Sequence, residues 1–107
     1  MAHYLVRAKP YWEKLSNLRS RLDAGEIVQM SPFGQALDDS LRRARLDSDD
    51  VAIWEEEDYC RPPLAMERAA VLDNYFTDLT VLPVERGQGW QKIKPLPSLW
   101  RPDDAEK

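Results

Sequence analysis

Cysteine, histidine and glycine are scarce in this chain of 107 residues, which has one cysteine, one histidine and four glycines. A single cysteine cannot form an internal disulfide, so we expect a reducing, cytoplasmic location. No H-x-x-x-H or C-x-x-C spacing is present, so we expect no metal site. The glycine-rich patterns that bind phosphate groups are absent as well, and we expect no cofactor.

Long apolar runs and an excess of positive charge are also missing. No run approaches the ~18 apolar residues of a membrane span. The segment 1–7 lacks the basic start and apolar stretch of a signal peptide. The net charge of −4 argues against broad contact with nucleic acid or anionic lipid, which both need a positive surface. We therefore expect no nucleic-acid and no membrane partner.

The composition that remains is typical of a small folded protein. Hydrophobic residues make up 43% and charged residues 32%, enough apolar surface for one hydrophobic core. The length predicts a single domain over residues 1–100. Residues 101–107 are polar and are predicted to be a disordered tail.

Hydrophobic periodicity predicts alternating strands and helices. Apolar residues at spacings of three and four predict helices over 11–24, 33–44 and 64–77, the third burying Ala65, Ala69, Leu72 and Phe76. Alternating or apolar runs predict strands over 4–8, 26–30, 51–58 and 79–84. Prolines 95 and 97 exclude a regular helix beyond Lys94, so an irregular C-terminal tail is expected.

This order, β-α-β-(α)-β-α-β, predicts the α+β class with an antiparallel sheet and a ferredoxin-like sandwich. Over residues 3–85 the order of elements resembles the dimeric α/β-barrel superfamily, in which two ferredoxin-like sheets pack face to face. The resemblance rests on element order and on no motif of that superfamily. It implies a homodimer formed through the open sheet face. The helix over 33–44, expected between the second and third strands, departs from the simplest version of that pattern.

The segment 51–61, Val-Ala-Ile-Trp-Glu-Glu-Glu-Asp-Tyr-Cys-Arg, is the most informative part of the chain, because an apolar strand turns acidic before a helix. Side chains of a strand alternate between faces. We expect the helix-covered face to carry Tyr4, Val6, Val51 and Ile53. The open face then carries His3, Leu5, Arg7, Trp54, Glu56 and Asp58.

Those open-face residues allow two interpretations. In the first they line a pocket for a small polar ligand, where Arg7 binds a carboxylate, Glu56 or His3 moves a proton, and Tyr59 donates a hydrogen bond. In the second, Arg7 forms an ordinary cross-strand ion pair with a glutamate, and His3 lies near a frayed end.

The only cysteine also allows more than one role. Arg61 and the start of the third helix would both lower the pKa of the Cys60 thiol and favour a nucleophile. A lone cysteine is also a common small core residue. Adjacent strand carboxylates point to opposite faces, which makes a shared ion at the acidic run unfavourable. Asp58, Cys60 and Arg61 are predicted to be contact residues.

Four tryptophans are many for this length. Trp90 and Trp100 lie in the predicted irregular tail and must dock on the protein's own sheet or on a second subunit. We predict Trp54, Trp90 and Trp100 at a subunit contact, so that a chain ending at Gly89 loses solubility or changes from dimer to monomer.

The leading hypothesis is therefore a cytoplasmic module that binds a small polar ligand or another protein, acting as a homodimer through its open sheet face and tail. A second hypothesis is a small cofactor-independent enzyme that transfers a proton or isomerises a small polar substrate. A third is an accessory subunit whose acidic strand end meets a basic partner.

Overall fold

The structure, a computed structural model, describes residues 2–100 and belongs to the α+β class. Its strands form one antiparallel sheet in the order β2-β3-β1-β4. The strands are β1 (His3–Pro10), β2 (Arg45–Leu46), β3 (Ala52–Glu57) and β4 (Phe76–Val84). As expected from the sequence, the first and third strands lie side by side in the centre.

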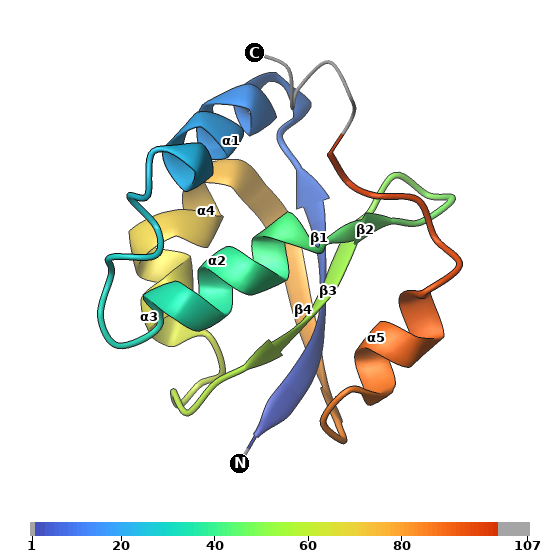
Figure 1. Cartoon of the computed structure of the whole chain (residues 1–107). Coiled ribbons are helices and arrows are strands. Elements are labelled where there is room, and N and C mark those ends of the chain that lie inside the picture. The colour runs from blue at the N-terminus through green and yellow to red at the C-terminus, as the bar shows by residue number, and fades with distance from the viewer. Residues whose placement is uncertain (1, 101–107) are drawn as a thin grey trace.

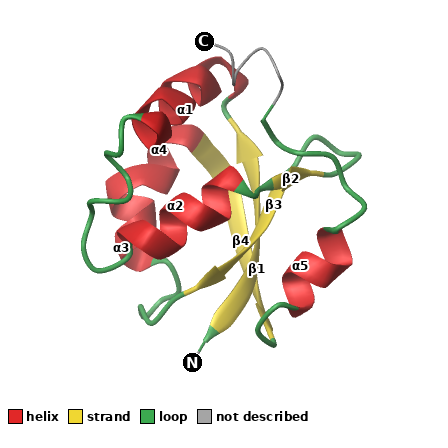
Figure 2. Cartoon of the chain, viewed as in Figure 1, coloured by secondary structure: helices red, strands yellow, loops and turns green. Residues whose placement is uncertain are grey.

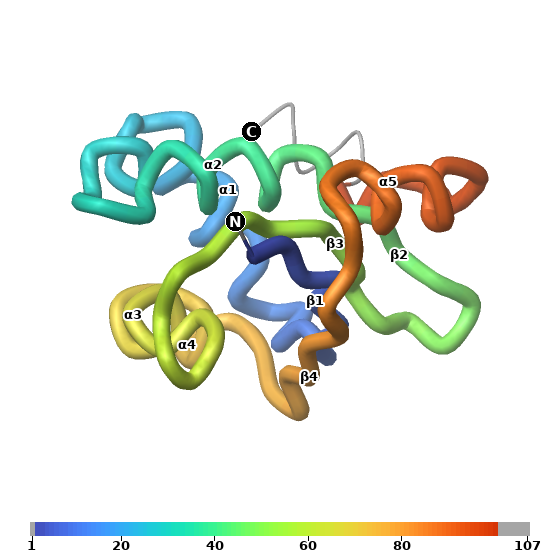
Figure 3. The backbone as a smooth tube through the Cα atoms, turned by 90° about the horizontal axis from the view of Figure 1, so that it is seen from below, coloured from blue at the N-terminus to red at the C-terminus, as the bar shows by residue number. Residues whose placement is uncertain are grey.

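Helices cover the two faces of the sheet unequally (Figures 1 and 2). The 3-10 turn η1 (Trp12–Lys14) leads into α1 (Leu15–Asp23), and α2 (Gly34–Arg42) follows. A later helical segment consists of α3 (Ala65–Glu67), the π-helical turn η2 (Arg68–Leu72) and α4 (Asp73–Tyr75). These elements lie on one side of the sheet, whereas α5 (Gln88–Ile93) lies on the other, beside β2 and β3 (Figure 3).

Each face of the sheet has its own apolar cluster. The larger one lies under α1 to α4 and takes Val6, Ala8, Ala52 and Trp54 from the strands. The smaller one joins Leu5, Ile53 and Ile93 beneath α5. None of the helices in the described range 2–100 is long and apolar enough to cross a membrane.

The predicted strand over 26–30 is wrong, because this segment forms turns between α1 and α2. Only Ile27 of the apolar run is fully buried. Gly34 fixes the turns: a Cβ atom there would lie 2.5 Å from the carbonyl oxygen of Ile27. The second strand follows α2 instead, at Arg45–Leu46, so the helix expected as an insertion belongs to the connection between the first two strands.

The faces predicted for β1 are confirmed, but those predicted for β3 are wrong. Val6 pairs with Trp54 and Tyr4 with Glu56, and directly paired residues share a face. Trp54 and Glu56 therefore point into the helix-covered core, and Ile53 points towards α5. A shift of one residue exchanges the two faces of a strand.

The buried stripe predicted for the segment after β3 is right in part: Leu72 and Phe76 are buried, whereas Ala65 is only half-buried. Ala69 is exposed, and Leu64, Glu67 and Val71 take the buried positions at spacings of three and four. The segment ends at Tyr75, so β4 starts earlier than expected. The tail contains α5, and the predicted disordered residues 101–107 lie outside the described residues.

Candidate functional site

The loop after β3 folds around the carboxylate of Asp58. Its Oδ2 atom accepts hydrogen bonds from the backbone N–H groups of Leu64 at 2.6 Å and Cys60 at 3.0 Å. Leu64 has a left-handed backbone with φ of 65°, which a branched side chain rarely adopts. This conformation turns the Leu64 amide towards Asp58 and starts α3 at the adjacent residue, so the loop holds Asp58 against the first turn of that helix.

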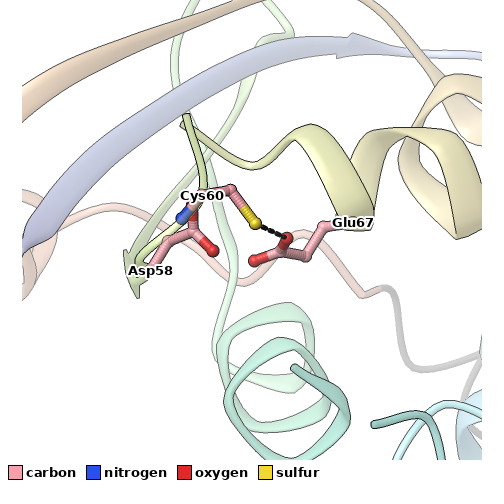
Figure 4. Close-up of side chains that lie close together, drawn as sticks. All are labelled: Asp58, Cys60 and Glu67. Atoms are coloured by element: carbon pink, nitrogen blue, oxygen red, sulfur yellow. Dashed lines mark hydrogen bonds between the residues drawn. The ribbon is translucent and has the colours of Figure 1, made fainter. Parts of the chain in front are cut away.

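Glu67, the last residue of α3, points into this loop and is 0% exposed. The thiol of Cys60 donates to its Oε1 atom across 3.7 Å, a long hydrogen bond of the kind that sulfur makes. Its Oε2 atom is buried and has no hydrogen-bond donor. Figure 4 shows Asp58 and Cys60 meeting Glu67 from the opposite side of the gap between loop and helix. The π-helical turn η2 begins at the next residue, and such turns are frequent at functional sites.

Glu56 adds a second buried carboxyl from β3. Its Oε1 atom accepts the indole N–H of Trp54 at 3.0 Å, but its buried Oε2 atom has no donor. Because a buried ionised carboxylate without donors is unfavourable, a carboxyl in this position favours its protonated form.

The environment separates the proton affinities of the three carboxyl groups. Burial raises the pKa of Glu56 well above its ordinary value, against the opposing hydrogen bond from Trp54. Burial also raises the pKa of Glu67 to about 7, and the neighbouring Asp58 carboxylate adds to the rise, because only the protonated Glu67 carboxyl can donate a hydrogen bond to it. Burial alone would raise the pKa of Asp58, but hydrogen bonds from Glu67 and the loop amides outweigh it and lower that pKa. Asp58 is thus the fixed anion, Glu56 the neutral acid, and Glu67 the group that titrates near neutral pH.

Beside this buried cluster lies an open pocket of about 430 Å³. It is lined by Ala2, Tyr4, Asp58, Tyr59, Cys60, Arg61, Pro62 and Pro63. Cys60 therefore faces both the pocket and Glu67. A backbone hydrogen bond from Met66 lowers the pKa of the thiol. Burial and the charges of the two nearby carboxylates raise that pKa by more, so the net pKa is above the ordinary value. The predicted lowering of the Cys60 pKa is wrong, because burial and the charges of Asp58 and Glu67 together outweigh the lowering.

Asp58, Cys60 and Glu67 are also the described residues that could hold a metal ion. Their ligand atoms lie within 4.8 Å of one another. A thiolate with two carboxylates would suit Zn²⁺ best among common ions. Two features oppose this use: the Oδ2 atom of Asp58 already accepts two amide hydrogen bonds, and the raised thiol pKa disfavours the thiolate.

The structure places His3 and Arg7 away from this cluster, on the α5 face. His3 lies between Glu55 and Glu57, with nitrogen–oxygen distances of 3.6 and 3.7 Å. Arg7 binds Asp47 at 2.6 Å instead of a strand-three glutamate. Glu55 accepts three backbone N–H groups of the segment Gly87–Trp90, so its carboxylate holds the start of α5 against β3.

Other predicted site residues separate into two groups. Asp58, Cys60, Arg61 and Tyr59 converge on the 430 Å³ pocket, and the Tyr59 hydroxyl also donates to Glu57 at 2.9 Å. The tryptophans dock within the chain: Trp54 has no exposed surface, and Trp100 is 7% exposed, donating its indole N–H to the carbonyl of Leu41. Trp90 is half-buried under the guanidinium of Arg43.

Sequence reasoning missed Glu67, which completes the cluster. The available signal was its spacing: it lies three residues after Leu64 and four before Val71, which places it on the buried stripe of that helix. A charged residue on such a stripe indicates a paired or protonated group. Comparison with protein-family models, curated proteins and solved structures gave no significant match.

Proposed function

We propose that this protein is a small enzyme that transfers a proton to and from a small polar molecule bound in the 430 Å³ pocket. The observation that carries the proposal is the position of Cys60, which lines the pocket and donates its thiol hydrogen to Glu67. Nucleophile or acid groups that touch both a pocket and a buried base are typical of proton-transfer sites.

Cys60 and Glu67 can carry out such a step without a proton donor or acceptor from outside the site. A substrate proton moves to the sulfur of Cys60 as the thiol proton moves to the carboxylate of Glu67. The reverse transfer returns a proton to the same or a neighbouring substrate atom, which gives exchange or isomerisation. A carboxyl with a pKa of about 7 suits both directions at neutral pH.

The pocket wall supplies groups that bind a polar substrate. Arg61 is exposed and makes no ion pair with any residue in the range 2–100, so its guanidinium is available to a carboxylate or carbonyl oxygen. The phenol of Tyr4 adds a donor to the lining, and the Tyr59 hydroxyl, whose hydrogen goes to Glu57, adds an acceptor oxygen. Asp58 is a positioning residue. Two backbone amides hold its carboxylate, which stays an anion and keeps Glu67 oriented.

Solvent exchange detected by NMR tests the proposal. The protein is incubated in D₂O with a panel of small 2-keto acids and 1,3-dicarbonyl compounds, whose α-protons are acidic, with a chelator present throughout. We expect one or more compounds to lose their α-proton signals with the wild type and at least tenfold more slowly with Glu67→Gln or Cys60→Ser. Glu85→Gln, an exposed control, should match the wild type. Absence of exchange for compounds that bind the pocket, or equal exchange in the variants, contradicts the proposal.

The ferredoxin-like relationship and the cytoplasmic homodimer remain further proposals. The antiparallel sheet with its first and third strands adjacent supports the former. For the dimer, the support is Leu82 on the outer strand β4, a large apolar side chain that is 53% exposed. Light scattering tests it: a dimeric wild type and a monomeric, folded Leu82→Lys variant are expected, and a monomeric wild type contradicts it.

A further inference from the structure

A second hollow of about 530 Å³ is lined by residues of α2, β2 and α5 and of the segments next to them. Figure 1 shows where these three elements lie. It is lined by Arg42, Arg43, Arg45, Gly87, Trp90, Gln91, Lys94 and Ser98. We call this hollow the basic groove. Its lining includes four cationic side chains and no carboxylate, although the chain as a whole carries a net charge of −4.

The cations of the basic groove differ in how far their charge is neutralised. Arg42 is fully engaged, binding Asp38 at 2.8 Å and Asp23 at 3.2 Å. Arg43 has an exposed partner, Asp39, at 3.3 Å. Its guanidinium also stacks over the ring of Trp90, 4.1 Å from the ring centre.

Arg45 and Lys94 have no carboxylate partner anywhere in the range 2–100. Arg45 is half-buried and is held in place by one hydrogen bond, from Nη1 to the carbonyl of Leu96 at 2.9 Å. Its remaining guanidinium N–H groups are available to a ligand. Two uncompensated positive charges in a concave, partly apolar surface attract an anion more strongly than the same charges on a convex surface.

We propose that the basic groove binds a small phosphorylated molecule. A phosphate monoester carries close to two negative charges at neutral pH, which matches the two uncompensated cations, whereas a monocarboxylate would leave one of them unpaired. Arg45 offers a planar fork for two phosphate oxygens, and Lys94 offers a mobile point charge. The volume is that of a ligand pocket, so there is room for an organic group beside the phosphate, against Trp90 and within reach of Gln91 and Ser98.

This inference is independent of the proton-transfer site, because no residue lines both hollows. The groove would bind its ligand whether or not Cys60 and Glu67 transfer a proton.

Titration with inorganic phosphate and then with glycerol 3-phosphate, followed by ¹H–¹⁵N NMR at constant ionic strength, tests the proposal. We expect saturable shifts of the Trp90 indole N–H and of the backbone N–H groups of Arg45 and Lys94, with the ester binding more tightly than inorganic phosphate. Chloride at the same ionic strength should produce none of these shifts.

Two variants make the result decisive. Lys94→Gln changes an exposed side chain and should weaken binding of glycerol 3-phosphate by about tenfold without unfolding the protein. Arg45→Gln should weaken it at least as much. Lys92→Gln, in α5 two residues before Lys94 but outside the groove, is the matched control and should bind as the wild type does. Shifts that do not saturate, equal affinity for the ester and inorganic phosphate, or unchanged binding in Lys94→Gln would overturn the proposal.

Discussion

Replacing Glu67 by glutamine removes the one group of the buried cluster that titrates near neutral pH, and it preserves the size of the side chain. The pKa of Glu67 is about 7 in the folded protein, against 4.5 for an ordinary glutamate. Between these values the folded state holds more protons than the unfolded state. The resulting stabilisation is complete below pH 4.5 and is lost as the pH rises through 7.

The size of this effect follows from the shift itself. At about 1.4 kcal/mol per pKa unit, the difference between 4.5 and about 7 corresponds to about 3 to 4 kcal/mol in the free energy of unfolding. Most of this difference falls between pH 5 and pH 8. Glu56 shifts in the same direction and adds to the loss in the wild type.

Urea unfolding followed by tryptophan fluorescence at pH 5 and pH 8 measures this effect. The stability of Glu67→Gln relative to the wild type should rise by about 2 to 3 kcal/mol from pH 5 to pH 8, because only the wild type must ionise Glu67. Ionisable groups remote from the cluster cancel in the comparison, whereas the pKa values of Glu56 and Asp58, which depend in part on Glu67, change with the substitution. Glu85→Gln, an exposed control, should leave the pH dependence unchanged. If Glu67→Gln and the wild type show the same pH dependence, the raised pKa and the proton-holding cluster are refuted.

Three further substitutions test the scaffold around the site, each by urea unfolding. Trp100→Ala should lose about 3 kcal/mol or more, because it removes a buried ring and one of the hydrogen bonds that the Leu41 carbonyl accepts; a loss below about 1 kcal/mol would mean that the tail is not part of the core. Gly34→Ala should lose about 2 kcal/mol, since its Cβ would lie 2.5 Å from the Ile27 oxygen, and a gain from higher helix propensity would contradict this close approach. Asp58→Ala should lose about 2 kcal/mol or more by leaving two loop amides without an acceptor, and an unchanged midpoint would show that water replaces them.

The sequence predicted where most helices and strands lie, because their apolar residues recur at the period of each element. It failed at 26–30, where an apolar run between Gly25 and a proline has the composition of a strand. There the close approach of Gly34 to Ile27 folds the chain into turns, a contact that hydrophobic periodicity does not reveal. Local pattern was overridden by packing between distant residues.

The site was predicted in part. The sequence marked the segment 51–61, and Asp58, Tyr59, Cys60 and Arg61 do meet at one pocket. The sequence does not decide which side chains of β3 point into the helix-covered core, because Ile53 and Trp54 are both apolar and either could be placed inward. The rule that charges stay outside favoured the wrong choice for Glu56, whose carboxyl is buried with an indole donor and has a raised pKa that favours its neutral form.

Local sequence patterns also could not predict that Glu67 meets Asp58 and Cys60. This convergence requires the left-handed turn at Leu64, which brings the loop back onto the first turn of α3. Neither the residue type nor the spacing of Leu64 indicates that conformation, since leucine ordinarily avoids it.

A ¹³C NMR titration of the glutamate side-chain carboxyl carbons tests the central claim most directly, with Glu67 assigned by its absence from Glu67→Gln. The account predicts that this carbon titrates near pH 7 and that the Glu56 carbon titrates at a pH well above that of an ordinary glutamate. A Glu67 carbon that titrates near 4.5 would mean that the carboxylate is stably ionised, and the proposed proton transfer through Cys60 would have no acceptor suited to neutral pH.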